Sequence, residues 1–513
     1  MKTGVTAAKA RSPVNFPESR ERHIVWLLCL LAAIHVFVFS AAFPFFNNVD
    51  EKEHFDLVIK YSQGHIPSNL ELFSPEAAKF VAICGSPEYL NLRYRVDSPG
   101  EAFPLPAWRY PLTEQNRQRL LAKAAIWRGQ RNQESTQSPL YYVLAGLWWH
   151  LGQGLGFNGG YLLYWLHFQN VLVMVGLVWL GFITAQLVFP GDRFLRLGVP
   201  ALLAFFPQTS FYSIQNDTLS PLCFGGAFIY LLKFQRAAVP DVRLGMLTGL
   251  TLATTFLVKI SNLPLLAVSA VVVVCKIWNL VKTGQWRASR PALVALAFCA
   301  GPPMLAWVSW CKYTLGDYGG TAAKIQMLGW TQKPFWEWWD HPILTPHGLW
   351  VFISQTLASF WRGEFTWHCQ RMALPVVDTI YIVASMLFVG VAAVALIPRF
   401  ATATQSQRQA LWFALASFAA GMAFLGLLSI CYDFHDCLYP SRAYPYFTSG
   451  RLMLGALIPF LLLFVYGLDR SLGWVKTAWP RWVVLAGFIL FMLVSEMAID
   501  WPAFFSPYNW FHM

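Results

Sequence analysis

The stretch IVWLLCLLAAIHVFVFSAAFPFF, residues 24–46, is a long apolar run, and after Asn47 it is followed by the polar stretch NVDEKEHF, residues 48–55. A helix of about 20 apolar residues crosses roughly 30 Å of hydrocarbon. The run is too long for the apolar core of a signal peptide, so we expect an uncleaved first span. Basic residues in the tail before it predict a cytoplasmic N-terminus.

Similar apolar runs recur along the whole chain of 513 residues. Only 12% of the residues are charged and the mean hydropathy is +0.44, whereas soluble domains carry about 25% charged residues. The sequence therefore predicts an all-α polytopic membrane protein. The net charge of +12 does not indicate a nucleic-acid partner, because the Lys and Arg residues lie in short loops beside apolar runs, where they orient the spans.

Placing every basic cluster on the cytoplasmic side predicts about eleven spans, within a range of about eleven to thirteen. After the first span, these are expected near 161–189, 198–214, 218–233, 244–258, 263–280, 291–311, 376–397, 409–431, 452–468 and 480–498. The apolar segments 139–155 and 348–361 are expected to be a re-entrant or interfacial helix and a surface helix, although either remains possible as a span. The predicted organisation is a basic tail, 1–23, and a single transmembrane domain, 24–513.

Polar residues collect on the face opposite to the basic loops. The predicted extracytoplasmic segments are 47–138, which is expected to contain juxtamembrane helices, 312–375 and 432–451. Unusual polar residues at the ends of spans mark functional sites in membrane proteins. A reaction site is therefore expected at this membrane surface.

The sharpest polar cluster directly follows the first span. Asn48 and Glu51 have the spacing of a capping box, which predicts the start of a helix. In that helix Asp50, Glu53 and His54 would share a face. An ionised carboxylate here is suited to accept a proton from a hydroxyl or to hold a divalent cation. The alternative is that these acidic residues only follow the cap of a solvated helix.

Other polar residues have two interpretations each. Glu134 is either a second carboxylate of the site or part of a polar loop, and Asp217 either faces a cavity or caps a helix. Lys259 either binds a phosphate or extends its ammonium group toward water. The remaining candidates are Arg442 and Arg451, which suit bidentate phosphate binding or pairing with Asp433 or Asp436, and the weaker pair Arg362 and Glu364.

Aromatic residues make up 16% of the chain, which fits both interfacial belts and stacking against sugars. Trp330, Trp336 and Tyr446 are the candidates for sugar or acceptor contacts. An oxidising compartment would allow Cys431 and Cys437 to form a disulfide across their short loop.

The order of these motifs resembles the GT-C superfamily of membrane glycosyltransferases, in particular bacterial proteins with a Pro-Asp-Glu-x-x-His-Phe signature after the first span. The matching residues are Val49-Asp50-Glu51-Lys52-Glu53-His54-Phe55, in which Val49 replaces the usual Pro. Further similarities are Ser138-Pro139-Leu140-Tyr141-Tyr142, Asn216-Asp217, Lys259 with Leu263-Pro264-Leu265, and Ser449-Gly450-Arg451. The resemblance covers most of the chain.

The resemblance implies an inverting enzyme of a bacterial plasma membrane, which moves a sugar from a polyprenyl-phosphate donor to a glycan, lipid or protein acceptor outside the cytoplasm. It implies that Asp50 is the catalytic carboxylate with Glu51 beside it, and that His54, Glu134 and Asp217 support it. If a divalent metal such as Mg²⁺ or Mn²⁺ takes part, its expected ligands are Asp50, Glu51, Glu134 and Asp217.

Two other functional classes remain open at this point. A transporter or lipid-linked glycan flippase would also be polytopic, although the sequence has no inverted repeat of the kind that transporters carry. A glycan ligase or polymerase with a diphosphate-linked donor would depend on outer Arg and His residues instead of on Asp50.

Overall fold

A computed structural model describes residues 18–88, 105–110, 113–400, 403–475, 477 and 479–512. Most of the predicted tail, 1–23, and part of the predicted loop 47–138 lie outside these ranges. The described chain is mainly helical. Its strands, each of two residues, form two antiparallel pairs: β1 (Thr331–Gln332) with β4 (Tyr432–Asp433), and β2 (Thr366–Trp367) with β3 (Gln370–Arg371).

Eight helical segments of the described chain are long and apolar enough to cross a membrane. They contain α1 (Glu18–Ala42), α7 (Gly159–His167) with α8 (Gln169–Val188), α12 (Leu263–Lys282), α13 (Trp286–Trp310), α16 (Pro375–Ala395), α17 (Gln405–Cys431), α18 (Leu457–Ser471) and α19 (Trp479–Phe505). These segments confirm the prediction of an all-α polytopic membrane protein. The predicted total of about eleven spans stays a prediction.

Three shorter helices account for the other predicted spans. They are α9 (Arg193–Ala204), α10 (Ser220–Arg236) and α11 (Val242–Val258). The predicted span at 198–214 is wrong in extent, because α9 ends at Ala204 and is followed by a loop with the short helix η1 (Thr209–Tyr212). Pro207 accounts for the break, since a proline excludes its predecessor from the helical conformation and cannot donate the next hydrogen bond.

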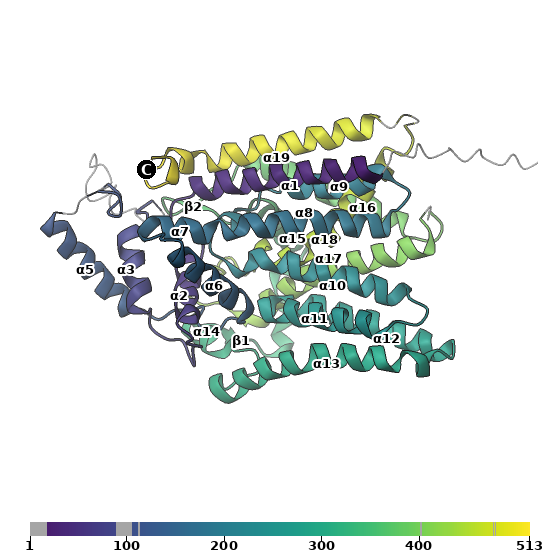
Figure 1. The fold of residues 1–513 in the computed structure, drawn as a ribbon, viewed down its shortest axis with the longest axis horizontal. Coiled ribbons are helices and arrows are strands. Elements are labelled where there is room, and N and C mark those ends of the chain that lie inside the picture. The colour runs from purple at the N-terminus through teal and green to yellow at the C-terminus, as the bar shows by residue number, and fades with distance from the viewer. Residues whose placement is uncertain are drawn as a thin grey trace, which may run out of the picture.

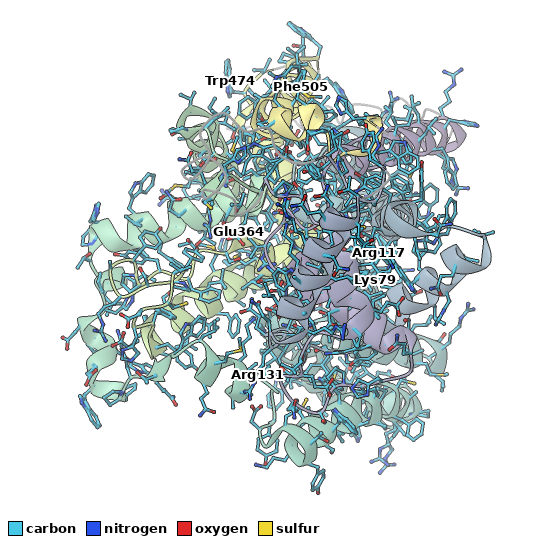
Figure 2. All side chains as sticks on the ribbon, turned by 90° about the vertical axis from the view of Figure 1, so that its left-hand side faces the viewer. Lys79, Arg117, Arg131, Glu364, Trp474 and Phe505 are labelled. Carbon is cyan, nitrogen blue, oxygen red and sulfur yellow. The ribbon has the colours of Figure 1, made fainter. Side chains whose placement is uncertain are left out.

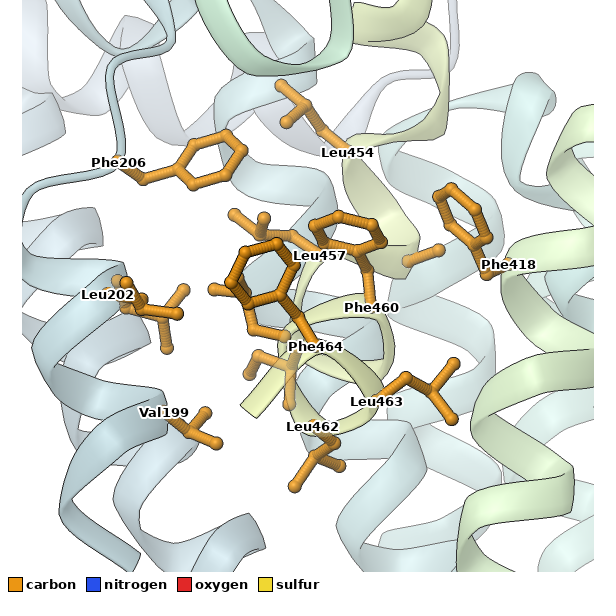
Figure 3. Packing of buried hydrophobic residues seen from close by; sticks show 14 of the residues in the cluster. Val199, Leu202, Phe206, Phe418, Leu454, Leu457, Phe460, Leu462, Leu463 and Phe464 are labelled. Carbon is orange, nitrogen blue, oxygen red and sulfur yellow. The ribbon is translucent and has the colours of Figure 1, made fainter. Parts of the chain in front are cut away.

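The long helices lie side by side along the longest dimension of the molecule (Figure 1). Helix α18 lies in the middle of this bundle. Of the most apolar stretch of the segment Gly450–Ser471, which contains α18, 94% is buried. Phe460 and Phe464 of α18 pack toward Phe418 of α17 and the residues that follow α9 (Figure 3). The interior of the bundle is therefore apolar along most of its length, and polar groups concentrate near its ends.

One end of the bundle carries most of the short elements, on the left in Figure 1 and facing the viewer in Figure 2. We call it the α2 end. It contains α2 (Glu51–Ser62), α3 (Pro75–Cys84), α5 (Glu114–Arg128), α6 (Leu140–Gly154) and α14 (Ala322–Met327). The short 3-10 helices are η2 (Asn216–Leu219), η3 (Ile260–Asn262), η5 (Phe335–Asp340), η6 (Pro342–Leu344), η7 (Gly450–Ala456) and η8 (Trp510–His512), and η4 (Cys311–Leu315) is a π-helix.

Two helices that were expected at the membrane surface are partly buried against the rest of the protein. In α6, Trp149 is only 1% exposed and packs edge-on against Phe55 of α2. In α15 (Pro346–Arg362) the second half is buried against α16 and η7, and only the first half is exposed as a surface helix would be. Within the buried half, the Ser359 hydroxyl donates to the Thr448 carbonyl at 2.6 Å and is thereby satisfied inside the bundle.

Candidate functional site

Asp50 ends the loop after the first span and lies directly before α2. Its φ is 62°, in the left-handed region. This conformation costs a residue other than glycine about 1 kcal/mol. The predicted capping box at Asn48 is wrong in one half: the Asn48 side chain donates to the Thr209 carbonyl at 3.1 Å, and only the Glu51 carboxylate returns to the Asn48 N–H, at 3.4 Å. The tight turn leaves the Asp50 carboxylate free to meet groups from other elements.

The main partner of Asp50 is Arg451, at the start of η7. The guanidinium of Arg451 lies 2.5 Å from Asp50 Oδ2 and 3.0 Å from Glu364 Oε2, and its Nη1 lies 3.6 Å from Asp217 Oδ2. Arg451 is 9% exposed. One buried guanidinium thus connects carboxylates from the first loop, from η2 and from the segment after α15.

Two further basic side chains complete the arrangement. Lys259, at the end of α11, donates to Asp217 Oδ1 at 2.6 Å. Lys324, on α14, forms an ion pair with Glu134, and Gln133 next to Glu134 donates to Asp50 Oδ1 at 2.9 Å. Lys324 could not be identified from the sequence, because it lies on a short helix far along the chain from Glu134.

We name this group the Arg451 cluster. Its carboxylates are Asp50, Glu134, Asp217 and Glu364, and its basic side chains are Lys259, Lys324, Arg371 and Arg451. Arg371 belongs to it through a 3.4 Å ion pair with Glu364. The two signs balance in number, which is what burial at the end of a membrane bundle requires.

The neighbouring basic groups keep the carboxylates of Asp50 and Glu134 ionised. Burial by itself would raise the pKa of the Asp50 carboxyl, but Arg451 and Lys324 outweigh burial and hold it well below its usual range. The pKa of Glu134 is also lowered, because Lys324 outweighs burial. Burial lowers the pKa of Lys259 from its ordinary value, although Asp217 opposes this. The site therefore holds anionic carboxylates in a desolvated place.

Several buried polar atoms in the cluster have no hydrogen-bond partner among the described residues. They include Asp217 Oδ2, Arg451 Nη1 and, beside Asp217, Asn216 Oδ1 and Gln215 Oε1. Leaving such an atom unpaired costs about 1–3 kcal/mol, so they are uncommon in folded proteins. Asp217 Oδ2 and Arg451 Nη1 face each other as an ion pair at 3.6 Å, so the unused hydrogen-bonding capacity lies mainly with Asn216 Oδ1 and Gln215 Oε1 beside them.

His54 lies one turn after Asp50. Its ring Nδ1 is 2.7 Å from the Tyr142 hydroxyl of α6, and it is 1% exposed. Burial lowers the pKa of His54 to about 4, despite Glu134 and Asp50 nearby. At neutral pH His54 is thus an uncharged hydrogen-bonding group that connects α2 to the Leu140-Tyr141-Tyr142 segment.

Glu51 points away from the Arg451 cluster. Its Oε1 lies 2.8 Å from His167 Nε2 of α7 and accepts from the Ile214 N–H at 3.2 Å. Of the four predicted metal ligands, Glu51 thus lies apart from the cluster, while Asp50, Glu134 and Asp217 each contact a basic side chain. In the part of the chain that the structure describes, no group of three or more His, Cys, Asp or Glu is arranged to hold a metal ion.

Arg442 lies outside the cluster. Its Nη2 is 3.0 Å from Asp433 Oδ2 and its side chain is 65% exposed, which matches the local pairing that the sequence left open. Cys431 and Cys437, which the sequence left open as a disulfide, are free thiols in the structure. Cys431 is the last residue of α17 and Cys437 contacts the Tyr439 carbonyl instead.

Of the three aromatic candidates, two pack against other side chains and one lies on the surface. The indole of Trp330 packs edge-on against Phe434 and Phe447. Tyr446 is 8% exposed and packs against His341. Trp336 is 74% exposed on η5. These contacts, all with other described residues, do not involve the Arg451 cluster, so the geometry does not support a role for the three aromatic side chains there.

No protein-family model matches the chain, and the search of curated proteins found no matching relative. The chemistry of the site must therefore be argued from its own residues.

Proposed function

We propose that the protein is a membrane glycosyltransferase of the GT-C type, which moves a sugar from a polyprenyl-phosphate donor to an acceptor at the α2 end. The observation that carries this proposal is the pairing of the ionised Asp50 carboxylate with Arg451, at the end of a bundle of apolar helices. Basic side chains beside a lipid phase suit an anionic lipid headgroup, and the carboxylate suits an acceptor hydroxyl.

The reaction has a simple balance of atoms. The acceptor oxygen attacks the anomeric carbon of the donor sugar, and the new C–O bond forms as the bond from that carbon to the phosphate oxygen breaks. The hydroxyl proton passes to Asp50, and the bonding electron pair leaves with the lipid phosphate. Attack from the face opposite to the phosphate inverts the anomeric centre.

The Arg451 cluster supplies both functions that this step requires. Arg451 and Lys259 are placed to neutralise the charge that develops on the departing phosphate, and Lys324 adds a third basic group. A phosphate that takes bidentate hydrogen bonds from Arg451 competes with Asp50 for the guanidinium. Donor binding therefore releases Asp50 toward the acceptor hydroxyl. The carboxylates of the cluster are already paired with basic side chains, so the proposed step does not pass through a metal ion.

The proposal includes an orientation. The protein would lie in a bacterial plasma membrane with its N-terminus in the cytoplasm and the α2 end outside. The supporting observation is that the short connections at the other end carry basic residues such as Arg193, Arg236 and Lys282.

The decisive experiment replaces Asp50 by Asn in the full chain in lipid nanodiscs. Transfer from a radiolabelled polyprenyl-phosphate hexose to extracted cell-envelope glycan should fall by roughly 10²-fold or more, as expected for loss of a positioned base. The matched control is Asp340→Asn, at an exposed position of η5, which should leave transfer unchanged. Full turnover by Asp50→Asn would remove the proposed mechanism.

A further inference from the structure

A cleft of about 440 Å³ opens at the α2 end, outside the Arg451 cluster. It is lined by Asn69, Leu70, Arg131, Ala323, Gln326 and Met327. Arg131 is exposed and lies on the end face that Figure 2 presents. The cleft is bounded by the loop after α2, by α14 and by the segment that begins at Arg131.

The cleft and the Arg451 cluster share two walls. On α14, Ala323 and Gln326 line the cleft, while Lys324 of the same short helix pairs with Glu134. In the other wall Arg131 lines the cleft, and two residues later Gln133 donates to Asp50 Oδ1 at 2.9 Å. Each of these two segments thus contributes residues both to the cleft and to the contacts of the Arg451 cluster.

The lining of the cleft suits a hydrophilic molecule. Asn69 and Gln326 offer amide donors and acceptors, and Arg131 offers a guanidinium for an anionic group. A polyprenyl chain would need a continuous apolar surface, whereas Leu70 and Met327 are the larger apolar side chains here. The chemistry of the cleft therefore separates it from the lipid part of a donor.

We infer that this cleft binds the acceptor, and that the acceptor is a hydrophilic glycan with a negatively charged group that Arg131 contacts. The inference rests on the proposed transferase function. It divides the site into a donor side at Arg451 and Lys259 and an acceptor side at Arg131 and Gln326. The Lys324–Glu134 ion pair lies on the boundary.

The boundary element is small. Helix α14 has six residues, and Gly320 and Gly329 on either side of it adopt φ of 65° and 70°. Such angles are strained for residues with a side chain. Both turns that bound α14 therefore have a backbone conformation that glycine favours.

The test fills the cleft and measures each substrate separately. Gln326→Trp blocks the cleft, and Arg131→Ala removes its charge. Both should raise the KM for extracted envelope glycan about tenfold, as expected for loss of a charge-assisted contact or of space. The KM for radiolabelled polyprenyl-phosphate hexose and its slow hydrolysis by water should stay at wild-type values. Arg131→Lys should recover part of the acceptor affinity.

Gln115→Trp on α5 is the matched control, because it adds the same indole to an exposed position of the same end without touching the cleft. If both cleft variants leave the acceptor KM unchanged while the wild type transfers sugar, the acceptor assignment is overturned and the transferase function stands. If the wild type neither transfers nor hydrolyses the donor, the proposed function is overturned instead.

Discussion

Arg451 Nη2 lies 2.5 Å from Asp50 Oδ2, although the two residues are 401 positions apart in the chain. The contact joins the loop after the first apolar helix to the start of η7, directly before α18. Because Arg451 also meets Glu364 and Asp217, a change at either end of the contact must alter the whole cluster. This relationship gives the first prediction.

Arg451→Gln leaves Asp50 and Glu364 buried without their main basic partner. We expect a loss of about 3–5 kcal/mol in the free energy of unfolding, the usual consequence of removing one member of a buried ion pair. The double variant Asp50→Asn with Arg451→Gln should recover part of this loss. Unfolding in detergent with increasing denaturant measures the coupling; additive losses would mean that the two side chains do not interact in solution.

The second prediction concerns pH and His54. Its folded-state pKa of about 4 lies below its ordinary value of 6.5. A depressed pKa means that the folded state disfavours the charged ring. The neutral His54 ring therefore contributes its full share to the free energy of unfolding above pH 6.5, and this share is lost as the pH falls toward 4. It amounts to roughly 3 kcal/mol at most.

His54→Gln removes the titrating ring but keeps an amide near the Tyr142 hydroxyl. The slope of unfolding free energy against pH should be shallower in this variant than in the wild type between pH 4 and 6.5. Thermal unfolding at a series of pH values provides the comparison. Identical slopes would show that His54 titrates normally in the folded protein.

The third prediction separates Glu51 from its neighbour Asp50. Glu51 contacts His167 and the Ile214 N–H and does not contact Arg451. Glu51→Gln should therefore lower stability by about 1–3 kcal/mol, the cost of a weakened buried hydrogen bond. The turnover of the folded fraction should stay within about twofold of the wild type. A loss of turnover as large as that of Asp50→Asn would return Glu51 to the reaction.

The fourth prediction uses Arg442 to distinguish two kinds of donor. Because Arg442 is exposed and paired with Asp433, Arg442→Ala should leave transfer from the polyprenyl-phosphate hexose within about twofold of the wild type, with less than about 1 kcal/mol of stability lost. A steady-state transfer assay of Arg442→Ala beside Arg451→Lys compares an exposed arginine with the buried arginine of the cluster. Strong dependence on Arg442 together with tolerance of Asp50→Asn would favour a ligase with a diphosphate-linked donor.

The sequence predicted the helical membrane architecture because apolar runs report burial in lipid residue by residue. It also predicted Asp50, Asp217, Lys259 and Arg451, which the structure brings together in one cluster. It missed Lys324 and Arg371, because their partners lie far away in the chain and no local pattern records such a pairing. The burial of Ser359 could not be predicted either, since a buried hydroxyl with an internal carbonyl partner is indistinguishable in sequence from a solvated one.

The central position of α18 has a consequence for how the protein is made. Residues 457–471 are synthesised late, and yet the earlier helices pack around them. Until this segment leaves the ribosome and enters the bilayer, its neighbours have no inner partner, and Arg451 has not reached Asp50. Completion of the core and completion of the charged cluster therefore coincide, so a chain interrupted before this point has neither a closed bundle nor an assembled site.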